Sequence, residues 1–232
     1  MEFENKTCSI CNIPIEENYC SRCGQRKLDK PVTIISLIKD FLSNTLSLEK
    51  SVFATIFKIL INPKLIVDNY SNGYKNYHSS PGKILLYGIA IIALHTSFVD
   101  KTVLGLTLNI QNISAQYLFW LLFFPILLFI SYVSFIRIEK GLSKHLISLT
   151  YIASSLFIVV TILNDIIILT YGDKLGFWAF ILFVFFVFLW NSKVLTKRNK
   201  FLYFSLNTII QIIIFAGIIS LFILAVNNID NG

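Results

Sequence analysis

Long apolar runs alternate with short polar loops over the last two thirds of the chain. A helix needs roughly 20 residues to cross a hydrocarbon core about 30 Å thick, and five runs approach or exceed this length. None of them alternates polar and apolar residues as the wall of a β-barrel does. Because lipid offers no partner for open backbone groups, the runs predict helices. The predicted spans are residues 84–99 (short), 117–136, 146–171, 175–195 and 201–226.

A segment of mixed character, residues 31–63, precedes the first span. Apolar residues recur there at helical spacing in two stretches, 34–46 and 52–60, and charged residues interrupt both. This pattern predicts two amphipathic helices at the inner membrane surface, with their apolar faces toward lipid or toward the bundle. A soluble helical hairpin packed on itself is the alternative.

Composition agrees with a membrane protein. Hydrophobic residues make up 55% of the chain and charged residues 14%, against about 45–50% and about 25% in soluble domains. We therefore expect an all-α polytopic membrane protein with five transmembrane helices. Its three predicted regions are a cytoplasmic zinc-ribbon-like head (1–30), interfacial helices with an elbow (31–83), and the transmembrane bundle (84–232).

The distribution of charge predicts the orientation. Eighteen of the twenty Lys and Arg residues lie on one side of the predicted spans, and only Lys101 and Lys174 lie on the other. Cytoplasmic loops collect Lys and Arg, so we expect the N-terminus in the cytoplasm and the C-terminus outside. The polar opening "MEFENK" lacks the apolar stretch of a cleavable signal, and the first span is expected to act as an uncleaved anchor. Abundant Ile, Phe, Leu, Asn and Lys fit an AT-rich bacterial genome, hence a bacterial inner membrane.

Two Cys-x-x-Cys pairs lie eight residues apart in the head. Each pair can direct two thiolates at one metal, and the loop between the pairs is long enough to complete the tetrahedron that Zn²⁺ accepts. Structural disulfides rarely persist in a reducing cytoplasm. Four cysteine ligands leave no open position, so the predicted zinc is structural; a redox dithiol or another metal, including an iron–sulfur centre, remain alternatives. The predicted ligands are Cys8, Cys11, Cys20 and Cys23.

The surroundings of these cysteines indicate the kind of partner. The head has too few apolar residues for a core of its own, so metal binding is expected to supply its folding energy. Its basic patch is small, is diluted by Glu16 and Glu17 and lacks interleaved aromatic residues, which makes nucleic acid an unlikely partner. We expect the head to lie against anionic lipid headgroups and to bind a cytoplasmic protein.

Polar residues inside the predicted spans are candidates for function. Asp165, beside Asn164, is the carboxylate well inside a span, and His95 near the outer end of the first span could meet it. The alternative is that the Asp165 side chain reaches the membrane–water interface or caps a packing contact between helices. Asn207 and Gln211, one turn apart, are more typical of helix–helix contacts. No catalytic set or phosphate-binding loop can be assembled, so an enzyme is the least supported class.

The segment "NYSNGYKNYHSSPGK", residues 69–83, predicts a membrane-anchoring elbow. Gly73 permits a turn with positive φ, and Pro81 gives a second break before the span. Its tyrosine rings suit headgroup depth, and Lys75 and Lys83 are expected to meet lipid phosphates. A specific lipid or ligand pocket is the alternative. The residues assigned to the elbow or pocket are Tyr70, Gly73, Lys75, Tyr77 and Pro81.

Two sequence motifs resemble an uncharacterised family of bacterial inner-membrane proteins, catalogued as a domain of unknown function. That family has a zinc-ribbon-like head ending in Cys-Gly-Gln, followed by Thr, Pro, Tyr, Gly-Lys-Arg, Tyr and Pro before its first span. Here the head ends in "CSRCGQ", and Tyr74 replaces the first base of Gly-Lys-Arg. The resemblance covers residues 8–95 and implies a membrane location and a metal head, with no known activity. The matching positions are Thr55, Pro63, Tyr70, Gly73, Lys75, Tyr77 and Pro81.

These observations predict a non-enzymatic integral membrane protein whose cytoplasmic zinc ribbon docks a partner at the inner membrane surface. The alternative is a small transporter or permease-like protein that uses polar residues of the bundle, His95 and Asp165 in particular.

Overall fold

The computed structural model describes residues 7–8, 10–14, 20–24, 33–35, 51–74, 78–106, 115–172, 175–196 and 201–230. These residues form seven helices and two isolated β-bridges, and no strand is present among them. The all-helical class is thus confirmed for the described part of the chain. The helices are α2 (Ser51–Ile61), α3 (Pro63–Ser71), α4 (Pro81–Phe98), α5 (Ala115–Phe135), α6 (Leu142–Tyr171), α7 (Phe177–Leu195) and α8 (Phe201–Asp230).

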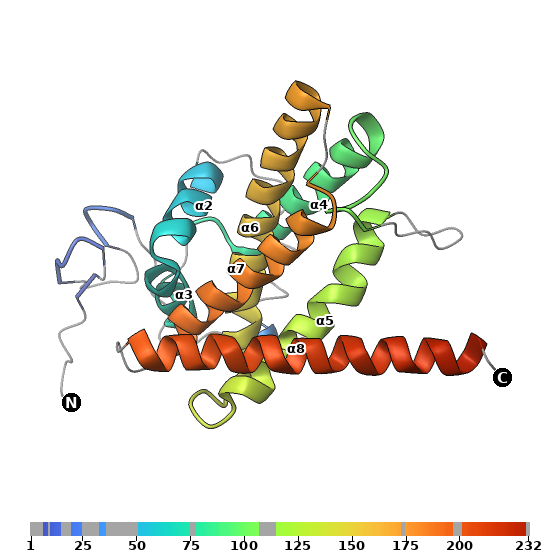
Figure 1. The fold of residues 1–232 in the computed structure, drawn as a ribbon. Coiled ribbons are helices and arrows are strands. Elements are labelled where there is room, and N and C mark those ends of the chain that lie inside the picture. The colour runs from blue at the N-terminus through green and yellow to red at the C-terminus, as the bar shows by residue number, and fades with distance from the viewer. Residues whose placement is uncertain are drawn as a thin grey trace.

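Helix α6 is the centre of the bundle. Residues 147–158 of this helix are all buried, because α4, α5, α7 and the short helices α2 and α3 pack around it. Figure 1 shows α2 and α3 on one side of α6 and α7, with α4 and α5 on the other side. A helix that is buried all round has no solvent-facing polar side, so the polar side chains of this stretch, such as Ser148 and Ser154, lie inside the bundle.

Four helices are long and apolar enough to cross a membrane: α4, α6, α7 and α8. The backbone of α5 covers most of the remaining predicted span, residues 117–136. Its described side chains run only from Phe119 to Phe135, which falls short of the length of a span. The structure therefore supports four of the five predicted spans, and the span at residues 117–136 remains a prediction. Helix α6 begins four residues before the predicted span 146–171.

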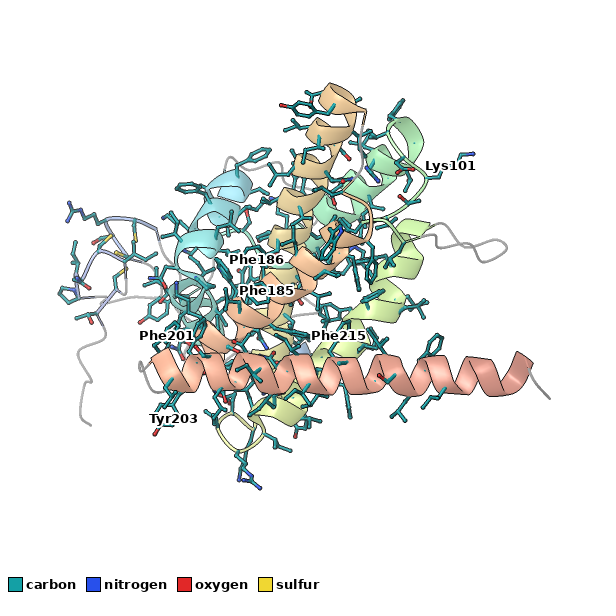
Figure 2. All side chains as sticks on the ribbon, in the orientation of Figure 1. Lys101, Phe185, Phe186, Phe201, Tyr203 and Phe215 are labelled. Atoms are coloured by element: carbon teal, nitrogen blue, oxygen red, sulfur yellow. The ribbon has the colours of Figure 1, made fainter. Side chains whose placement is uncertain are left out.

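Among its described side chains, helix α8 packs against the core as far as Ile218. Phe215 packs against Phe180 and Phe188 of α7, with ring centroids 6.5 and 5.6 Å apart (Figure 2). Beyond that point most described side chains are exposed, Leu221 and Phe222 by 68% and 71%, and the helix extends past α5 toward the C-terminus (Figure 1). Lipid chains are as apolar as these side chains, so this surface suits the interior of a bilayer.

The amphipathic segment folds partly as expected. Helix α2 matches the second predicted amphipathic helix, and it turns Val52, Ile56 and Ile59 into the bundle while Phe53 and Phe57 stay exposed. Helix α3, which was not predicted, buries its own apolar residues in the same core. The first predicted amphipathic helix lies outside the described residues apart from 33–35. Of the two orientations left open by the sequence, α2 thus takes the one that faces the bundle.

The corner between α2 and α3 depends on α7. Pro63 begins α3 and has no N–H group, so it cannot bond to the carbonyl groups that end α2. Trp190 Nε1 donates to the carbonyl oxygen of Leu60 at 3.0 Å, and Lys193 Nζ donates to that of Ile61 at 3.2 Å. Two side chains one turn apart on α7 therefore cap α2.

Two lysines tie α3 to its neighbours at this end of the bundle, which we call the proximal end. Lys64 Nζ donates to the carbonyl oxygen of Thr196, just after α7, at 3.3 Å. Lys144 Nζ on α6 lies 2.8 Å from Asp68 Oδ1 on α3. Both groups of this ion pair are about one third exposed, so the pair positions α3 more than it stabilises the fold. The opposite end, with the α4–α5 and α6–α7 connections, is the distal end.

Candidate metal centre and polar sites of the bundle

The four cysteines of the head converge on one point. Their Sγ atoms all lie within 4.8 Å of one another, and those of Cys8 and Cys23 are 3.6 Å apart. A tetrahedron with Zn–S bonds of about 2.3 Å places its sulfurs about 3.8 Å apart, whereas a disulfide requires about 2.05 Å. All four thiols are free. The arrangement therefore fits a single tetrahedral metal ion.

Backbone turns direct each pair of thiols. Asn12 and Gly24, each directly after the second cysteine of a pair, have φ values of 55° and 67°. The N–H of Asn12 donates to the carbonyl oxygen of Cys8 at 2.8 Å, and that of Gly24 to Cys20 at 2.9 Å. Asn and Gly are the residues that adopt positive φ most readily. An Asn or Gly directly after Cys-x-x-Cys was therefore a signal for these turns that the sequence reasoning did not use.

The turns also favour the thiolate form. Hydrogen bonds from the backbone N–H groups of Cys23 and Arg22 lower the pKa of the Cys20 thiol to about 7, although desolvation acts in the opposite direction. Cys8 and Cys20 are buried, and Cys11 and Cys23 are half-buried. Because the thiolate is the form that binds metal, this shift favours Cys20 as a metal ligand.

The head contacts the bundle through the predicted elbow. Gly73 has a φ of 88°, and its backbone N–H donates to the carbonyl oxygen of Tyr70 at 3.1 Å. The backbone N–H of Tyr74 donates to the carbonyl oxygen of Asn69 at 2.9 Å. This pattern is a Schellman motif, which commonly ends helices at a glycine. The predicted turn is thus present. It places Tyr74 so that its hydroxyl donates to the carbonyl oxygen of Thr7, beside Cys8, at 3.2 Å.

The remaining elbow residues lie partly in the core. Tyr70 is only 4% exposed, and its ring meets that of Tyr151 edge-on at 5.6 Å. Pro81 begins α4, as predicted. Lys83 is 5% exposed, so the prediction that it meets lipid phosphates, which requires an exposed ammonium group, is wrong. Lys75 and Tyr77 lie outside the described residues.

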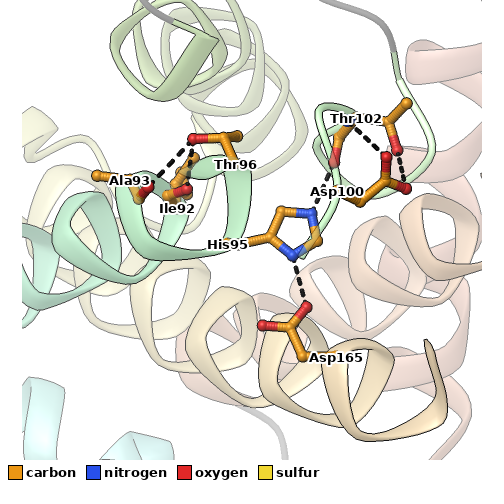
Figure 3. A network of polar contacts seen from close by, with 7 residues as sticks. All are labelled: Ile92, Ala93, His95, Thr96, Asp100, Thr102 and Asp165. Atoms are coloured by element: carbon orange, nitrogen blue, oxygen red, sulfur yellow. Dashed lines mark hydrogen bonds and ion pairs between the residues drawn. The ribbon is translucent and has the colours of Figure 1, made fainter. Parts of the chain in front are cut away.

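The structure brings His95 and Asp165 together at the distal end, as expected (Figure 3). His95 is buried, and its Nδ1 lies 2.5 Å from Asp165 Oδ1 while its Nε2 lies 2.7 Å from the carbonyl oxygen of Thr102. A carbonyl oxygen only accepts, so Nε2 carries a proton. The Nδ1 contact then holds one more proton, on the imidazole or on the carboxyl group. We call these two residues the distal pair.

The distal pair also holds the α4–α5 connection in place. Asp100 accepts bonds from the backbone N–H and the hydroxyl of Thr102 at 3.3 and 2.9 Å, which fixes the carbonyl group that His95 contacts. Val103 and Leu104 are buried just beyond it. Asn164 is 5% exposed, and its Oδ1 has no hydrogen-bond partner. Of the three residues predicted for an intramembrane polar site, His95 and Asp165 therefore form a bonded pair, and the Asn164 amide is separate from it.

A second polar cluster, which the sequence reasoning missed apart from Gln211, connects four helices at the proximal end. Asn191 on α7 donates to Ser131 Oγ on α5 at 2.9 Å and to Gln211 Oε1 on α8 at 3.0 Å, and it accepts from Ser148 Oγ on α6 at 2.9 Å. Every member is completely buried. We call this cluster the proximal network; its members are Ser131, His145, Ser148, Asn191, Ser192 and Gln211.

The remaining bonds of the proximal network show that its members are well satisfied. His145 Nε2 lies 3.1 Å from the carbonyl oxygen of Glu139 and must donate to it, so Nδ1 of the neutral ring accepts from Ser131 Oγ at 2.8 Å. Gln211 Nε2 donates to Ser192 Oγ at 2.7 Å. A serine bonded to a histidine is also the geometry of a catalytic nucleophile, but neither residue has exposed surface. The network therefore joins helices, as expected for Gln211.

Comparison with known proteins adds no further constraint on these sites: no protein-family model, curated protein or solved structure matches this chain.

Proposed function

We propose that this chain is an integral protein of a bacterial inner membrane whose cytoplasmic, zinc-binding head docks a partner protein at the membrane surface. The observation that carries the proposal is the convergence of four free thiols within 4.8 Å, on a polar segment that contacts the helical bundle. Four sulfurs complete the coordination of Zn²⁺. A metal in this site would shape a small binding module and would not activate a substrate.

The distribution of charge supports the orientation. In a five-span arrangement, the proximal end and the head share the side that carries eighteen of the twenty Lys and Arg residues, which is the cytoplasmic side of membrane proteins. Membership of the uncharacterised family, on the Cys-Gly-Gln ending and the Tyr, Gly and Pro positions of the elbow, is part of the same proposal.

The docking surface is the exposed face of the two cysteine turns. Asn12, Ser21 and Arg22 are exposed there, whereas the thiols of Cys8 and Cys20 are turned inward. Arg22 gives this face a positive charge, so a partner with acidic residues is expected. Tyr74 contacts the head at Thr7, outside the two cysteine turns, which leaves the docking face free for a partner.

Elemental analysis of detergent-purified protein tests the metal centre. We expect about one equivalent of zinc per chain, as four sulfur ligands imply, and we expect Cys20→Ser to lose it. Ser21→Ala, an exposed neighbour within the same turn, should retain the metal. Zinc-free protein with two disulfides in the head would overturn the proposal.

Site-specific photocrosslinking in intact cells tests the docking. A photoreactive residue at Ser21, which is exposed beside Arg22, should give one defined protein adduct by mass spectrometry, and Cys20→Ser should abolish that adduct. The same group at Lys101, which extends from the distal end (Figure 2), should not give it. An adduct that survives the loss of zinc would show that the metal-bound head is not the docking element.

A further inference from the structure

The α4–α5 connection turns apolar side chains inward at the distal end of the bundle. Val103 and Leu104 are only 1% and 2% exposed, and both belong to the hydrophobic core. Connections usually run over the surface, because a buried one must find partners for its backbone polar groups. Val103 and Leu106 satisfy each other through two backbone bonds of 2.9 and 3.0 Å. The carbonyl oxygen of Thr102 is bonded by a side chain of α4, His95 (Figure 3).

The connection is held in an unfavourable backbone conformation. Leu104 has a φ of 50°, in a region that residues other than Gly, Asn and Asp rarely adopt. Gly105 follows with a φ of 76° and lies against the backbone of Gly176. Such conformations persist only where surrounding contacts impose them. The bond from His95 to Thr102, two residues before Leu104, is one of these contacts, so the connection is expected to relax when that bond is lost.

The two bonds of His95 fix the number of protons that this arrangement needs. Nε2 carries one proton, which it donates to Thr102, and the contact of Nδ1 with Asp165 contains a second. If the second proton leaves, a neutral imidazole has a single N–H for two acceptors, a carbonyl oxygen and a carboxylate. Hydrogen bonds to an ionised acceptor are the stronger ones. The remaining proton is therefore expected on Nδ1, and Thr102 loses its donor.

We propose that the distal pair is a proton-dependent clasp for the α4–α5 connection. With the shared proton bound, His95 bonds to α6 and to the connection at once. Without it, His95 stays with Asp165, and residues 102–106 are released from the bundle. Asp165 lies within two turns of the end of α6 and is 21% exposed, so the pair exchanges protons with the distal solution. Because the closed state binds the additional proton, the clasp is closed at low pH and opens as the pH rises.

The other charged or titratable groups at the distal end have different surroundings. On the connection, Asp100 accepts two bonds from within the connection itself, and Lys101 is exposed. On α6 the next such group is Tyr171, which is 80% exposed. The described side chains of α5 and of the first turns of α7 at this end contain no titratable group. On the α6–α7 connection, Asp173 and Lys174 lie outside the described residues.

Hydrogen–deuterium exchange of the native chain in detergent tests the clasp. The backbone N–H groups of Val103 and Leu106 are bonded within the connection, so they exchange only when it opens. After correction for the intrinsic effect of pH on exchange, we expect protection of a peptide covering residues 99–106 to fall at least tenfold between pH 6 and pH 9. Protection of residues 147–158 of α6 should stay constant. Constant protection of the connection over the same range would overturn the proposal.

Asp165→Asn separates a proton-dependent clasp from a purely structural contact. The asparagine amide donates to Nδ1 of a neutral imidazole, so both bonds of His95 survive without the additional proton. We expect protection of residues 99–106 in this variant to be as high at pH 9 as at pH 6. Tyr171→Phe, which removes an exposed phenol from the same helix, should keep the native dependence on pH. Low protection of Asp165→Asn at both pH values, or a flat profile for Tyr171→Phe, would overturn the proposal.

Discussion

The two polar clusters of the bundle satisfy their hydrogen bonds to different degrees. In the proximal network Asn191 makes three side-chain bonds to three other helices, and no member is exposed. Between the middle of α6 and the bonded pair of His95 and Asp165, helices α5 and α6 carry five buried atoms without hydrogen-bond partners, namely Trp120 Nε1, Ser154 Oγ, Ser155 Oγ, Thr161 Oγ1 and Asn164 Oδ1. A fully satisfied buried network rigidifies the fold, whereas a partly satisfied one retains capacity to bind something else. The two ends of α6 thus differ in how completely their buried polar groups are hydrogen-bonded.

Asn191→Ala should give the largest effect, because it deprives three helices of a shared partner. Ser148, Ser131 and Gln211 would each lose a bond inside the bundle. We expect a loss of about 2–4 kcal/mol in the free energy of unfolding, measured by thermal or denaturant unfolding in detergent.

Asn207→Ala is the matched control for that change. Asn207 donates one bond, to Thr196 Oγ1 at 2.8 Å, and it is only half-buried, so it should lose well under half as much. Equal losses of unfolding free energy for the two variants would mean that the proximal network does not hold the four helices together. The two polar clusters would then not differ in their contribution to stability.

Gly105→Ala should disturb the distal end without changing a polar side chain. Gly105 has a φ of 76°, and a Cβ there would overlap the backbone of Gly176 at the start of α7. We expect a loss of about 2–3 kcal/mol. At Gly172, with a φ of 72° and open space around it, alanine should cost only about 1 kcal/mol. Similar melting temperatures for the two variants would show that the α4–α5 connection is not packed against α7.

Ser131→Ala and Ser134→Ala compare a satisfied and an unsatisfied hydroxyl on one helix. Ser131 bonds to His145 and Asn191, so its loss should cost about 1–2 kcal/mol. Ser134 Oγ is buried and has no hydrogen-bond partner, so alanine there should be neutral or stabilising. A destabilised Ser134→Ala would reveal a partner for that hydroxyl, such as an internal water.

His78→Gln should give the smallest effect, visible only in the dependence of stability on pH. Burial, and then the charge of Lys58, lowers the pKa of His78 from 6.5 to about 4. The unfolded chain therefore binds the proton first, so stability is greatest above about pH 6.5 and declines as the pH falls toward 4. Replacing His78 should reduce that decline. An unchanged decline would mean that the acid sensitivity arises from other groups.

The sequence predicted the features that depend on local pattern. The spanning helices were found because their apolar runs are long, and the meeting of His95 with Asp165 followed from their common depth. The turn at Gly73 followed from the tolerance of glycine for positive φ. The convergence of the four thiols followed from their spacing.

Features that depend on distant contacts could not be predicted. Asn191 occurs once in an apolar run, beside a loop rich in Lys and Arg, and nothing local indicates that it bonds to three other helices. Helix α3 is short and only weakly apolar, and it is stabilised by its contacts with α6 and α7. The sequence predicted an exposed Lys83, because a lysine just before a span usually lies at the membrane surface. In the structure the first turn of α4 lies inside the bundle, so Lys83 is buried.

The capping of α2 by Trp190 and Lys193 implies an order of events during biosynthesis. The bonded groups are 130 to 132 residues apart in the chain, and ribosomes add roughly 5–20 residues per second, so α2 leaves the ribosome about 7–26 s before its caps exist. During that interval the carbonyl groups at its end must bond to water. The α2–α3 corner can therefore close only after α7 has been inserted, which makes one of the earliest segments to be synthesised one of the last to reach its final position.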